Sequence, residues 1–415
     1  MTKKTNLPEL RFPEFRDEWE DKRLGNEISF LAGYAFDSKD MMTEPSNYQL
    51  LKMSNVYQNE LRLDRNPSFW GVLNDKQKGI ILQVGDTILT LTGTVGKQDY
   101  GYSVQIKESD KYLLNQRLVR LRGKKNITAN SFISFLVSTE KFLYYFFSNS
   151  KGGTGNQSNV SIEDIKSIRF FLPSLSEQKK IASFIRVVDE KLQTLKKKKA
   201  LLEQHKKGVM QKIFSQELRF KDDNGKEFSK WENKKLNDIG KFFSGTGFTN
   251  SEQGGGSGIP FYKVSDMNLK GNHFEMLTAN NYVTHEQTKR LNYKIINKPS
   301  IIFAKVGAAI FLERKRIANK FLIDNNMMAF IPIGNIYFYK YIFDTLTLSK
   351  FAQVGALPSY NSSDLSIIKL MIPSYDEQTK IANFLSAIDE KINLCTTQIE
   401  KTEQYKKGLL QKMFV

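Results

Sequence analysis

The chain of 415 residues carries 62 Lys and Arg against 44 Asp and Glu, which gives a formal net charge of +18 and a pI near 9.5. This basic surplus favours a polyanionic partner, and nucleic acid is the first candidate. Hydrophobic residues at 40% and aromatic residues at 12% suffice for packed cores, which excludes a disordered chain. With no signal peptide, no apolar run long enough to cross a membrane and a single cysteine (Cys395), we expect a cytoplasmic protein without disulfides.

A short lead-in segment opens the chain and returns later. Glu-Leu-Arg-Phe stands at residues 9–12 and again at residues 217–220. In both places a Trp-Glu-x-Lys-x-Leu sequence follows, at residues 19–24 and 231–236. This recurrence indicates an internal repeat whose unit begins with the lead-in.

The stretch after the first lead-in, residues 25–172, mixes short strand and helix patterns. Residues 80–89 predict a strand, a turn and a strand, and the alternation over residues 117–122 predicts another strand. Residues 131–148 are apolar and aromatic enough to predict one buried helix, and the glycine-rich residues 152–158 predict a flexible loop. An α/β domain is therefore expected.

The clearest repeat is a long helix. Residues 177–214 return at residues 377–414 with no gap, and seventeen of the 38 aligned positions are identical, including Asp-Glu-Lys and Lys-Lys-Gly. Apolar residues alternate at spacings of four and three, as in a coiled-coil seam, which Lys206 and Lys406 interrupt. Both copies open with Pro-Ser-x-x-Glu, which predicts a capping box whose Ser and Glu bond free amides at the helix start.

Two such seams in one chain most simply bury each other. We therefore predict a pseudo-twofold arrangement in which the two long helices form an antiparallel coiled coil, with a globular domain at each end. The alternative is that each helix packs alone on its own domain. The predicted divisions are residues 1–172 and 217–372 for the two globular domains, and residues 173–216 and 373–415 for the two helices.

The second globular stretch follows the plan of the first, with different loops. Lys52–Val56 corresponds to Lys263–Met267, and Asn115-Gln116 is aligned with Asn325-Asn326. The sequence Thr-Val-Gly at residues 94–96 is aligned with Lys-Val-Gly at residues 305–307. Two domains that share a scaffold but differ in their loops should present two different ligand-contacting surfaces.

Sequence motifs for catalysis are weak. Phe-Ser-Gly-Thr-Gly at residues 243–247 has the form of an adenosylmethionine loop, but the first copy lacks it, no amino-methylation Pro-Pro-Tyr motif is present, and a turn is the better interpretation. Gly-Thr-Val-Gly-Lys at residues 93–97 has the wrong spacing for a phosphate loop. Three histidines and one cysteine lack zinc-site spacing. We expect neither catalysis nor a metal in this chain.

These features together resemble the specificity subunit of type I restriction–modification enzymes, over nearly the whole chain. The most specific parts are the helix openings at residues 173–182 and 373–382, which share Glu-Gln-x-x-Ile-Ala, and the helix ends with Lys-Gly-Leu/Val-x-Gln-Lys. In the globular stretches, Gly-Asn-Gln at residues 155–157 matches the family's loop, whereas Ala-Leu-Pro-Ser-Tyr at residues 356–360 departs from it.

The resemblance implies two α/β target-recognition domains separated by two long spacer helices, and a role in binding double-stranded DNA. It also implies partners: two methyltransferase subunits that carry S-adenosylmethionine and methylate adenine, and two restriction subunits that can join to use ATP and Mg for cleavage. The chain itself would supply no cofactor and no catalysis. It would determine which DNA sequence the complex recognises, namely a bipartite asymmetric target with a gap.

The candidate DNA-contacting residues are polar or basic side chains near the loops of each domain, because Lys and Arg bind phosphate whereas amides and Arg contact base edges. In the first domain they are Lys52, Ser54, Asn55, Thr92, Thr94, Lys97, Tyr100, Tyr102, Asn115, Gln116, Arg117, Gln157 and Asn159. In the second they are Lys263, Ser265, Asp266, Lys305, Arg314, Lys315, Arg316, Asn325, Asn326, Ser359, Tyr360 and Asn361.

Two other functions are compatible with parts of the sequence. A coiled-coil scaffold that binds proteins without contacting DNA would show no salt-dependent affinity for DNA. A self-contained DNA adenine methyltransferase would bind adenosylmethionine alone, against which the missing Pro-Pro motif argues.

Overall fold

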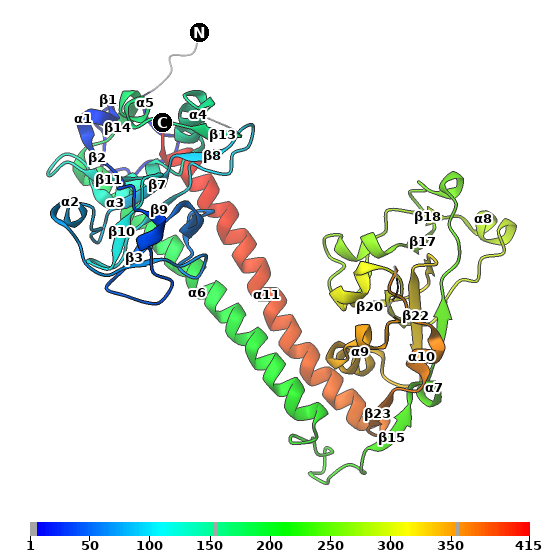
Figure 1. Ribbon diagram of the computed structural model, residues 1–415. Coiled ribbons are helices and arrows are strands. Elements are labelled where there is room, and N and C mark those ends of the chain that lie inside the picture. Colours follow the sequence, from blue (N-terminus) through cyan, green and yellow to red (C-terminus); the bar gives the residue numbers. More distant parts are fainter. Residues whose placement is uncertain (1–5, 153–155, 354, 356) are drawn as a thin grey trace. The chain divides into compact units, whose positions relative to one another are not determined.

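The computed structural model describes residues 6–152, 156–353, 355 and 357–415, and the chain forms two compact units (Figure 1). Unit 1 comprises Met1–Lys196 with Thr397–Val415, and unit 2 comprises Lys197–Thr396. The boundaries fall within both long helices rather than between helices and globular parts. Each unit therefore contains the first half of one helix and the last half of the other.

The two long helices coincide with the predicted repeat: α6 is Leu175–Phe214 and α11 is Tyr375–Met413. Their apolar seam explains why they form, because residues spaced by three and four share one face of a helix. The seam positions in the first half of each helix are buried in both copies, namely Ile181, Ile185, Val188, Ile381, Leu385 and Ile388.

In unit 1 the segments of α6 and α11 run antiparallel. Asp189 of α6 pairs with Lys406 of α11, at 2.6 Å between Oδ1 and Nζ. Further along α6, Lys196 pairs with Glu403, which precedes Lys406 on α11, at 3.0 Å. The partner moves backward along α11 as α6 advances, so the predicted antiparallel coiled coil is confirmed.

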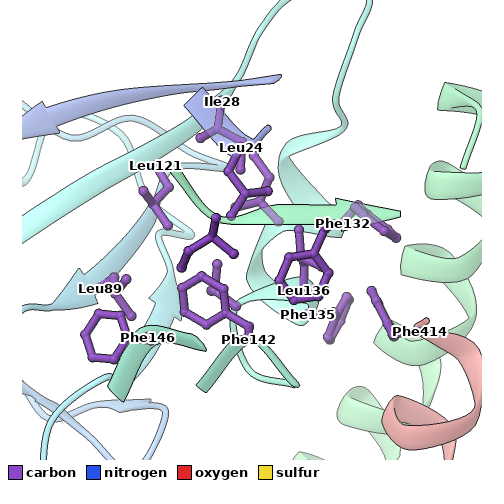
Figure 2. Packing of buried hydrophobic residues seen from close by; sticks show 14 of the residues in the cluster. Leu24, Ile28, Leu89, Leu121, Phe132, Phe135, Leu136, Phe142, Phe146 and Phe414 are labelled. Carbon is purple, nitrogen blue, oxygen red and sulfur yellow. The ribbon is translucent and has the colours of Figure 1, made fainter. Parts of the chain in front are cut away.

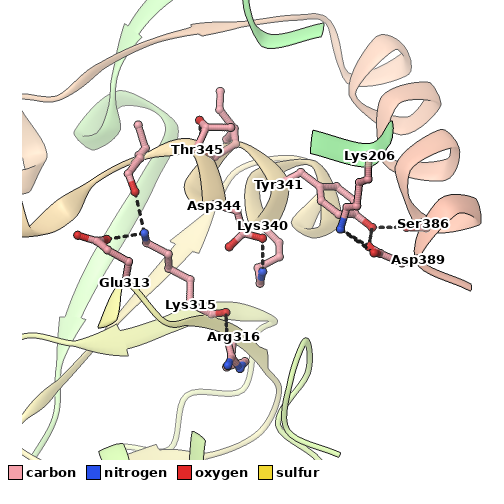
Figure 3. A network of polar contacts seen from close by, with 12 residues as sticks. Lys206, Glu313, Lys315, Arg316, Lys340, Tyr341, Asp344, Thr345, Ser386 and Asp389 are labelled. Atoms are coloured by element: carbon pink, nitrogen blue, oxygen red, sulfur yellow. Dashed lines mark hydrogen bonds and ion pairs between the residues drawn. The ribbon is translucent and has the colours of Figure 1, made fainter. Parts of the chain in front are cut away.

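Unit 2 contains the symmetric contact. Lys206 Nζ lies 2.6 Å from Asp389 Oδ1, between the last half of α6 and the first half of α11 (Figure 3). Each lysine that interrupts a seam therefore forms an ion pair with the aspartate of the Asp-Glu-Lys sequence on the other helix: Lys206 with Asp389, and Lys406 with Asp189. A charged residue at a seam position selects register, so these pairs favour the symmetric pairing over a shifted one.

The lead-in of each repeat is attached to the start of a long helix. The Glu177 carboxylate accepts hydrogen bonds from Arg11 Nε at 2.7 Å and Nη2 at 2.8 Å, and from Trp19 Nε1 at 3.3 Å. Unit 2 repeats this contact with Arg219, Trp231 and Glu377. The capping-box expectation was therefore half right: the Ser174 hydroxyl accepts from the Glu177 amide at 3.4 Å, but the glutamate binds the lead-in.

The lead-in also contacts the end of the other long helix. Leu218 N donates to Lys212 O at 3.0 Å, directly after α6. The equivalent residue at the start of the chain, Leu10, donates to Lys412 O at 2.9 Å, at the end of α11. The first lead-in thus occupies the place that a lead-in following α11 would take.

The globular part of unit 1 is a mixture of short strands and helices, as the α/β expectation required (Figure 1). Its helices and strands are β1 (Glu20–Arg23), α1 (Leu24–Glu27), β2 (Ile28–Ala32), η1 (Ser38–Asp40), β3 (Tyr48–Leu51), η2 (Met53–Asn55), β4 (Val56–Tyr57), β5 (Glu60–Leu61), β6 (Phe69–Trp70), α2 (Asp75–Lys78), β7 (Thr87–Thr90), β8 (Thr92–Thr94), β9 (Ser103–Gln105), β10 (Tyr112–Leu114), β11 (Leu118–Gly123), α3 (Asn130–Leu136), α4 (Glu140–Ser148), β12 (Lys151–Gly152), β13 (Gln157–Asn159), α5 (Ile162–Ser167) and β14 (Arg169–Leu172).

Among the described residues, the central sheet of unit 1 is antiparallel with strand order β2-β11-β7-β9. A small sheet, β12-β13-β8, lies beyond the end of β7, because β8 continues the same stretch of chain. A third sheet, β10-β3-β6, contains the parallel pair β3 and β10.

Unit 2 repeats the central sheet as β16-β22-β19-β20 and the parallel pair as β17 and β21. Its elements before α11 are β15 (Glu232–Lys235), α7 (Leu236–Ile239), β16 (Gly240–Ser244), η3 (Asn250–Glu252), β17 (Ile259–Tyr262), η4 (Val264–Asn268), β18 (Tyr282–Val283), α8 (His285–Arg290), β19 (Ser300–Ala304), η5 (Ala308–Leu312), β20 (Lys315–Ala318), β21 (Leu322–Ile323), β22 (Met327–Pro332), α9 (Ile336–Thr345), η6 (Leu348–Phe351), α10 (Ser362–Ser366) and β23 (Lys369–Ile372).

The core of unit 1 joins the globular part to the helices. Phe132 on α3 stacks on Phe414, the residue after α11, with ring centroids 5.2 Å apart (Figure 2). The same cluster buries Leu89, Leu121 and Phe146. Because apolar surface from three parts of the chain is removed from water together, the helix ends are integral to the domain core.

Two local expectations were wrong. Residues 80–84 form no strand and contribute one isolated bridge, Ile81 with Leu113, before the turn at Gly85. The single helix expected over residues 131–148 is two helices, α3 and α4, because the Thr139 hydroxyl caps the start of α4 by accepting from the Phe142 amide at 3.2 Å. Gly155 and Ala356, in the two loops compared above, lie outside the described residues.

Across the part of the chain that the structure describes, no helix combines the length and the apolar character that crossing a membrane requires.

Candidate nucleic-acid interface

The small sheet of unit 1 presents a row of polar side chains. β8 pairs with β13 so that Thr94 lies opposite Gln157, and Thr92 opposite Asn159. Because alternate residues of a strand share a face, these four side chains project from the same side of the sheet. Gln157 and Asn159 are exposed, and Thr92 and Thr94 are half-exposed. The sequence proposed all four, and the structure brings them together.

The other face of this sheet is buried and explains its position. Tyr100 is 3% exposed, and its hydroxyl lies 2.6 Å from Ser150 Oγ and 3.1 Å from Ser158 Oγ. Gly93 leaves room for this tyrosine, since a β-carbon at residue 93 would lie 2.3 Å from the Tyr100 ring. Ser150 and Ser158 were not singled out in the sequence, where nothing links them to Tyr100.

The turn after β8 is held by Asp99. Its carboxylate accepts from Thr94 N at 2.8 Å and from Thr94 Oγ1 at 2.7 Å, and these bonds lower the pKa of Asp99. A deprotonated carboxylate keeps both bonds, so the turn is preorganised at neutral pH. Lys97 is exposed within this turn.

A second set of polar residues borders the same sheet. Gln116 and Arg117 are exposed in the turn between β10 and β11, and the Arg117 carbonyl accepts from Leu91 N at 3.2 Å. Together with Thr92 and Asn159 they line an open depression of about 460 Å³. We call the exposed and half-exposed set strip 1; its members are Thr92, Thr94, Lys97, Gln116, Arg117, Gln157 and Asn159.

On the equivalent surface of unit 2, the residues that correspond in the structure are not those that the sequence alignment paired. Lys305 N donates to Asn326 O at 2.8 Å, as Leu91 N does to Arg117 O, so Asn326 corresponds to Arg117. Gly245 abuts the Asp324 carbonyl as Gly33 abuts that of Asn115, so Asp324 corresponds to Asn115. The sequence alignment of Asn115-Gln116 with Asn325-Asn326 was therefore wrong by one residue.

The strand alignment was wrong by three residues. Tyr360 N donates to Lys305 O at 3.2 Å, as Val160 N does to Leu91 O at 3.0 Å. Val306 pairs with Ser359, as Thr92 does with Asn159, so Gly307 is the counterpart of Gly93. We call this surface of unit 2 strip 2; its members are Val306, Ala308, Asn325, Asn326, Leu357 and Ser359. The half-exposed Lys305 lies next to it.

Five predicted residues are inaccessible to DNA in this structure, because each is 3% exposed or less and its polar group is bonded inside the protein. Asn55 Nδ2 donates to the Arg62 and Arg65 carbonyls, and Lys315 Nζ donates to Glu313 Oε2 at 2.6 Å (Figure 3). These five side chains support the loops rather than contact a ligand; they are Asn55, Tyr100, Asp266, Lys315 and Tyr360.

The remaining predicted residues lie outside the two strips. Several have polar partners in the protein: Lys52 Nζ donates to Ser68 Oγ, Lys263 Nζ to Gln253 Oε1, and Arg316 Nε to the Asn272 carbonyl. Ser265 and Asn361 are exposed, the latter as the N-cap of α10. The half-exposed members of this group are Lys52, Ser54, Tyr102, Asn115, Lys263, Lys305, Arg314 and Arg316.

The glycine-rich motif at residues 243–247 is a packing feature. A β-carbon at Gly245 would lie 1.7 Å from the Asp324 carbonyl oxygen, so only glycine allows the strand to pass. Thr246 then forms a parallel bridge with Asp324. No group of three His, Cys, Asp or Glu able to hold a metal occurs among residues 6–152, 156–353, 355 and 357–415.

The chain matches the family model described as the type I restriction modification DNA specificity domain, over residues 16–204 and again over residues 228–404. A specificity subunit of the type I restriction enzyme MjaVIII from Methanocaldococcus jannaschii is 25% identical, over 98% of this chain and 95% of the relative. The EcoAI specificity subunit of Escherichia coli is 26% identical over 46% of this chain and 31% of its own length.

Solved structures agree with the fold. The S subunit of a type I restriction–modification system from M. genitalium aligns with a TM-score of 0.59 at 16% identity, over 99% of both chains. A chain from a structural study of complex assembly in the type I R-M system aligns with a TM-score of 0.56 at 15% identity, over 95% of this chain and 97% of that one. With both repeats covered by the family model, this chain belongs to the family of type I restriction–modification DNA specificity subunits.

Proposed function

We propose that the chain selects a bipartite DNA target, with unit 1 contacting one half-site through strip 1 and unit 2 contacting the other through strip 2. The family match over both repeats carries this proposal. Strip 1 supports it physically, because six polar or basic side chains gather on one accessible surface over a buried face, with Lys97 exposed in the adjoining turn. The net charge of +18 favours the approach of a polyanion.

Each side chain of strip 1 has a role that suits its chemistry. Gln157 and Asn159 carry amides, which can bond adenine N6 and N7 in the major groove. Arg117 can form two bonds to guanine O6 and N7, or bind phosphate. Lys97, on the exposed turn, is suited to phosphate and would set register without selecting a base.

The asymmetry of the target follows from the difference between the strips. Strip 2 has Asn325 and Asn326 where strip 1 has Gln116 and Arg117, so the two half-sites would differ in sequence. We further propose that the paired helices α6 and α11 set the gap between half-sites. A helix rises about 1.5 Å per residue, and one turn of B-DNA spans about 34–36 Å, so helices of this length suit half-sites one to two turns apart.

The chemistry would be supplied by partners. We propose that two methyltransferase subunits bind this chain and bring S-adenosylmethionine for adenine methylation. Two restriction subunits can then add ATP- and Mg-dependent cleavage. The chain itself would do no catalysis, and it would act in the cytoplasm, where these partners meet DNA. One structural neighbour was solved in a study of complex assembly in a type I R-M system, and this likeness supports an assembled state.

Methylome sequencing tests the proposal. The chain is co-expressed with its methyltransferase partner, and the methylated adenines are mapped in DNA grown with and without the chain. We expect methylation at one asymmetric sequence with a non-specific gap, which disappears without the chain. A continuous target would contradict the two-half-site mechanism.

Two further outcomes separate the other functions. Methylation by the chain alone, with adenosylmethionine bound to it, would indicate a self-contained methyltransferase. Affinity for DNA that is absent in every subunit combination would indicate a protein scaffold, since phosphate contacts make DNA affinity fall with salt.

A further inference from the structure

Strip 2 is more apolar than strip 1. Where unit 1 has Thr92, unit 2 has Val306, as the shared strand pairing shows. Two residues further on, the place of Thr94 is taken by Ala308, the first residue of the short helix η5. On the facing segment, Leu357 stands where Gln157 stands in unit 1. Leu357 is 63% exposed, so its apolar surface is available to a ligand.

The loop that follows the shared glycine strengthens this difference. After Gly93 the chain continues with the turn of Asp99 and Lys97, in which Val95, 47% exposed, is a single large apolar side chain. After Gly307 it forms the short helix η5, on which Phe311 is 59% exposed and Leu312 is 56% exposed. Leu357 lies close to the same glycine, since a β-carbon on Gly307 would be 3.7 Å from Leu357 Cδ1.

Large apolar side chains so exposed and so grouped indicate a contact surface rather than a stabilising core. Their neighbours identify the partner. Asn325 and Asn326 are exposed on the same strip, and an asparagine amide is the preferred partner of adenine N6 and N7. The one apolar group that a base pair offers in the major groove is the thymine C5-methyl. Both kinds of side chain therefore suit the same A·T base pair.

We infer that unit 2 recognises an A·T-containing half-site, with Leu357, Phe311 and Leu312 packed against thymine methyl groups and the strip asparagines bonded to adenine. This rests on the proposed function, because it assumes that strip 2 faces DNA. The half-exposed Lys305 beside the strip suits a neighbouring phosphate. Unit 1 has Arg117 in the place of Asn326 and a single exposed valine, Val95, in the equivalent turn, so it recognises its half-site mainly by hydrogen bonds.

Replacing thymine by deoxyuridine tests the inference, because it removes the methyl group and leaves base pairing intact. Duplex oligonucleotides carry the methylome-derived target with thymines replaced in one half-site at a time. Affinity is measured for the complex of this chain with its methyltransferase partner. We expect replacement in one half-site to weaken binding about fourfold per contacted thymine, from the transfer free energy of one methyl group. Replacement in the other half-site should change affinity less than about twofold, because unit 1 presents one valine where unit 2 presents three larger apolar side chains.

A triple variant assigns the effect to unit 2. Phe311→Ala, Leu312→Ala and Leu357→Ala together should weaken binding to the thymine target and abolish the difference between thymine and deoxyuridine. Leu277→Ala is the matched control, since Leu277 is a 67% exposed leucine of unit 2 outside the strip. Thermal unfolding of the variants checks the fold, which these exposed positions should leave intact.

Two results would overturn the inference while leaving the proposed function standing. They are equal affinity for thymine and deoxyuridine in both halves, and a triple variant that loses the methyltransferase subunit but keeps its DNA affinity. The last would make the apolar surface a protein contact. Absence of any gapped target would overturn both proposals.

Discussion

Lys206 and Asp389 connect the helix pair of unit 2 to its globular part. The Asp389 carboxylate accepts from Lys206 Nζ through both oxygens, at 2.6 Å for Oδ1 and 2.7 Å for Oδ2, and Oδ2 also accepts from the Tyr341 hydroxyl at 2.7 Å (Figure 3). The Lys206 ammonium also lies 4.8 Å from the centre of the Tyr341 ring. Because burial raises the pKa of Tyr341, its hydroxyl remains a donor at all physiological pH values.

Removing this carboxylate should destabilise unit 2. Asp389→Ala leaves the partly buried Lys206 without its partner, and we expect a loss of about 2 kcal/mol in the free energy of unfolding. Asp189→Ala in unit 1 is the matched comparison and should cost less, because Lys406 there lies near the Phe135 ring, which offers no hydroxyl. Urea titration measures both, and an equal loss would show that Tyr341 contributes nothing.

The lead-ins give a second prediction. Glu377→Gln removes the charge that Arg219 Nη2 contacts at 2.7 Å, with a glutamate side chain that is fully buried. We expect a loss of about 3 kcal/mol and faster proteolysis between α6 and β15, because the lead-in is released from the helix. Glu177→Gln should open the lead-in at the start of the chain instead. Cleavage at unchanged sites and rates would contradict this role.

Asp324 should make unit 2 depend on pH. It is 7% exposed, and burial raises the pKa of its carboxyl group. The folded chain then binds this proton at a higher pH than the unfolded chain, so the contribution of Asp324 to stability improves as pH falls through its folded pKa and is lowest above it. Asp324→Asn removes this dependence.

The variant has a natural precedent, since unit 1 has Asn115 at the equivalent position. We expect Asp324→Asn to be more stable than the wild type at pH 7 and the difference to shrink towards about pH 4, near the ordinary Asp pKa. Thermal unfolding across this range measures it. A difference that grows on acidification would show that Asp324 is stabilising when charged.

The helix glycines provide a fourth stability test. Gly208 and Gly408 lie well inside α6 and α11, and a β-carbon at either position would meet no atom within 4 Å. Alanine should therefore stabilise each helix by about 1 kcal/mol. If Gly208→Ala is stable but fails to bind the methyltransferase subunit, the open space is used by that partner.

Salt dependence distinguishes phosphate contacts from base contacts in strip 1. Lys97→Ala should weaken binding similarly on all sequences and reduce the slope of log affinity against log salt by about one. Gln157→Ala should cost about 1–3 kcal/mol on the specific target alone, with the slope unchanged. The reverse pattern would exchange the two assignments.

The sequence was most informative where structure depends on local periodicity. The seam positions from Ile181 onward located both long helices to within two residues, because helical faces repeat every few residues. The partners of Glu177 could not be predicted, since Arg11 stands 166 residues away and the same Ser-x-x-Glu pattern predicts a capping box. Thr139 divided a helix for a similar reason: an N-cap within an apolar run is a weak signal.

The site was predictable in composition but not in register. Thr92, Thr94, Gln157 and Asn159 were proposed together because they are polar loop residues, and strand pairing then placed them on one face. Tyr100 was proposed for the same reason, although Gly93 and Ser158 enclose it. Sequence alone cannot distinguish a buried tyrosine with internal partners from an exposed one.

Because unit 1 includes Thr397–Val415, the order of synthesis and the order of folding differ. A nascent chain leaving the ribosome contains every residue of unit 2 before it contains the last segment of unit 1, even though unit 1 holds the first 196 residues. Phe414, which stacks on Phe132, is synthesised after every residue of unit 2. Truncation within residues 397–414 would therefore damage the unit whose synthesis began first.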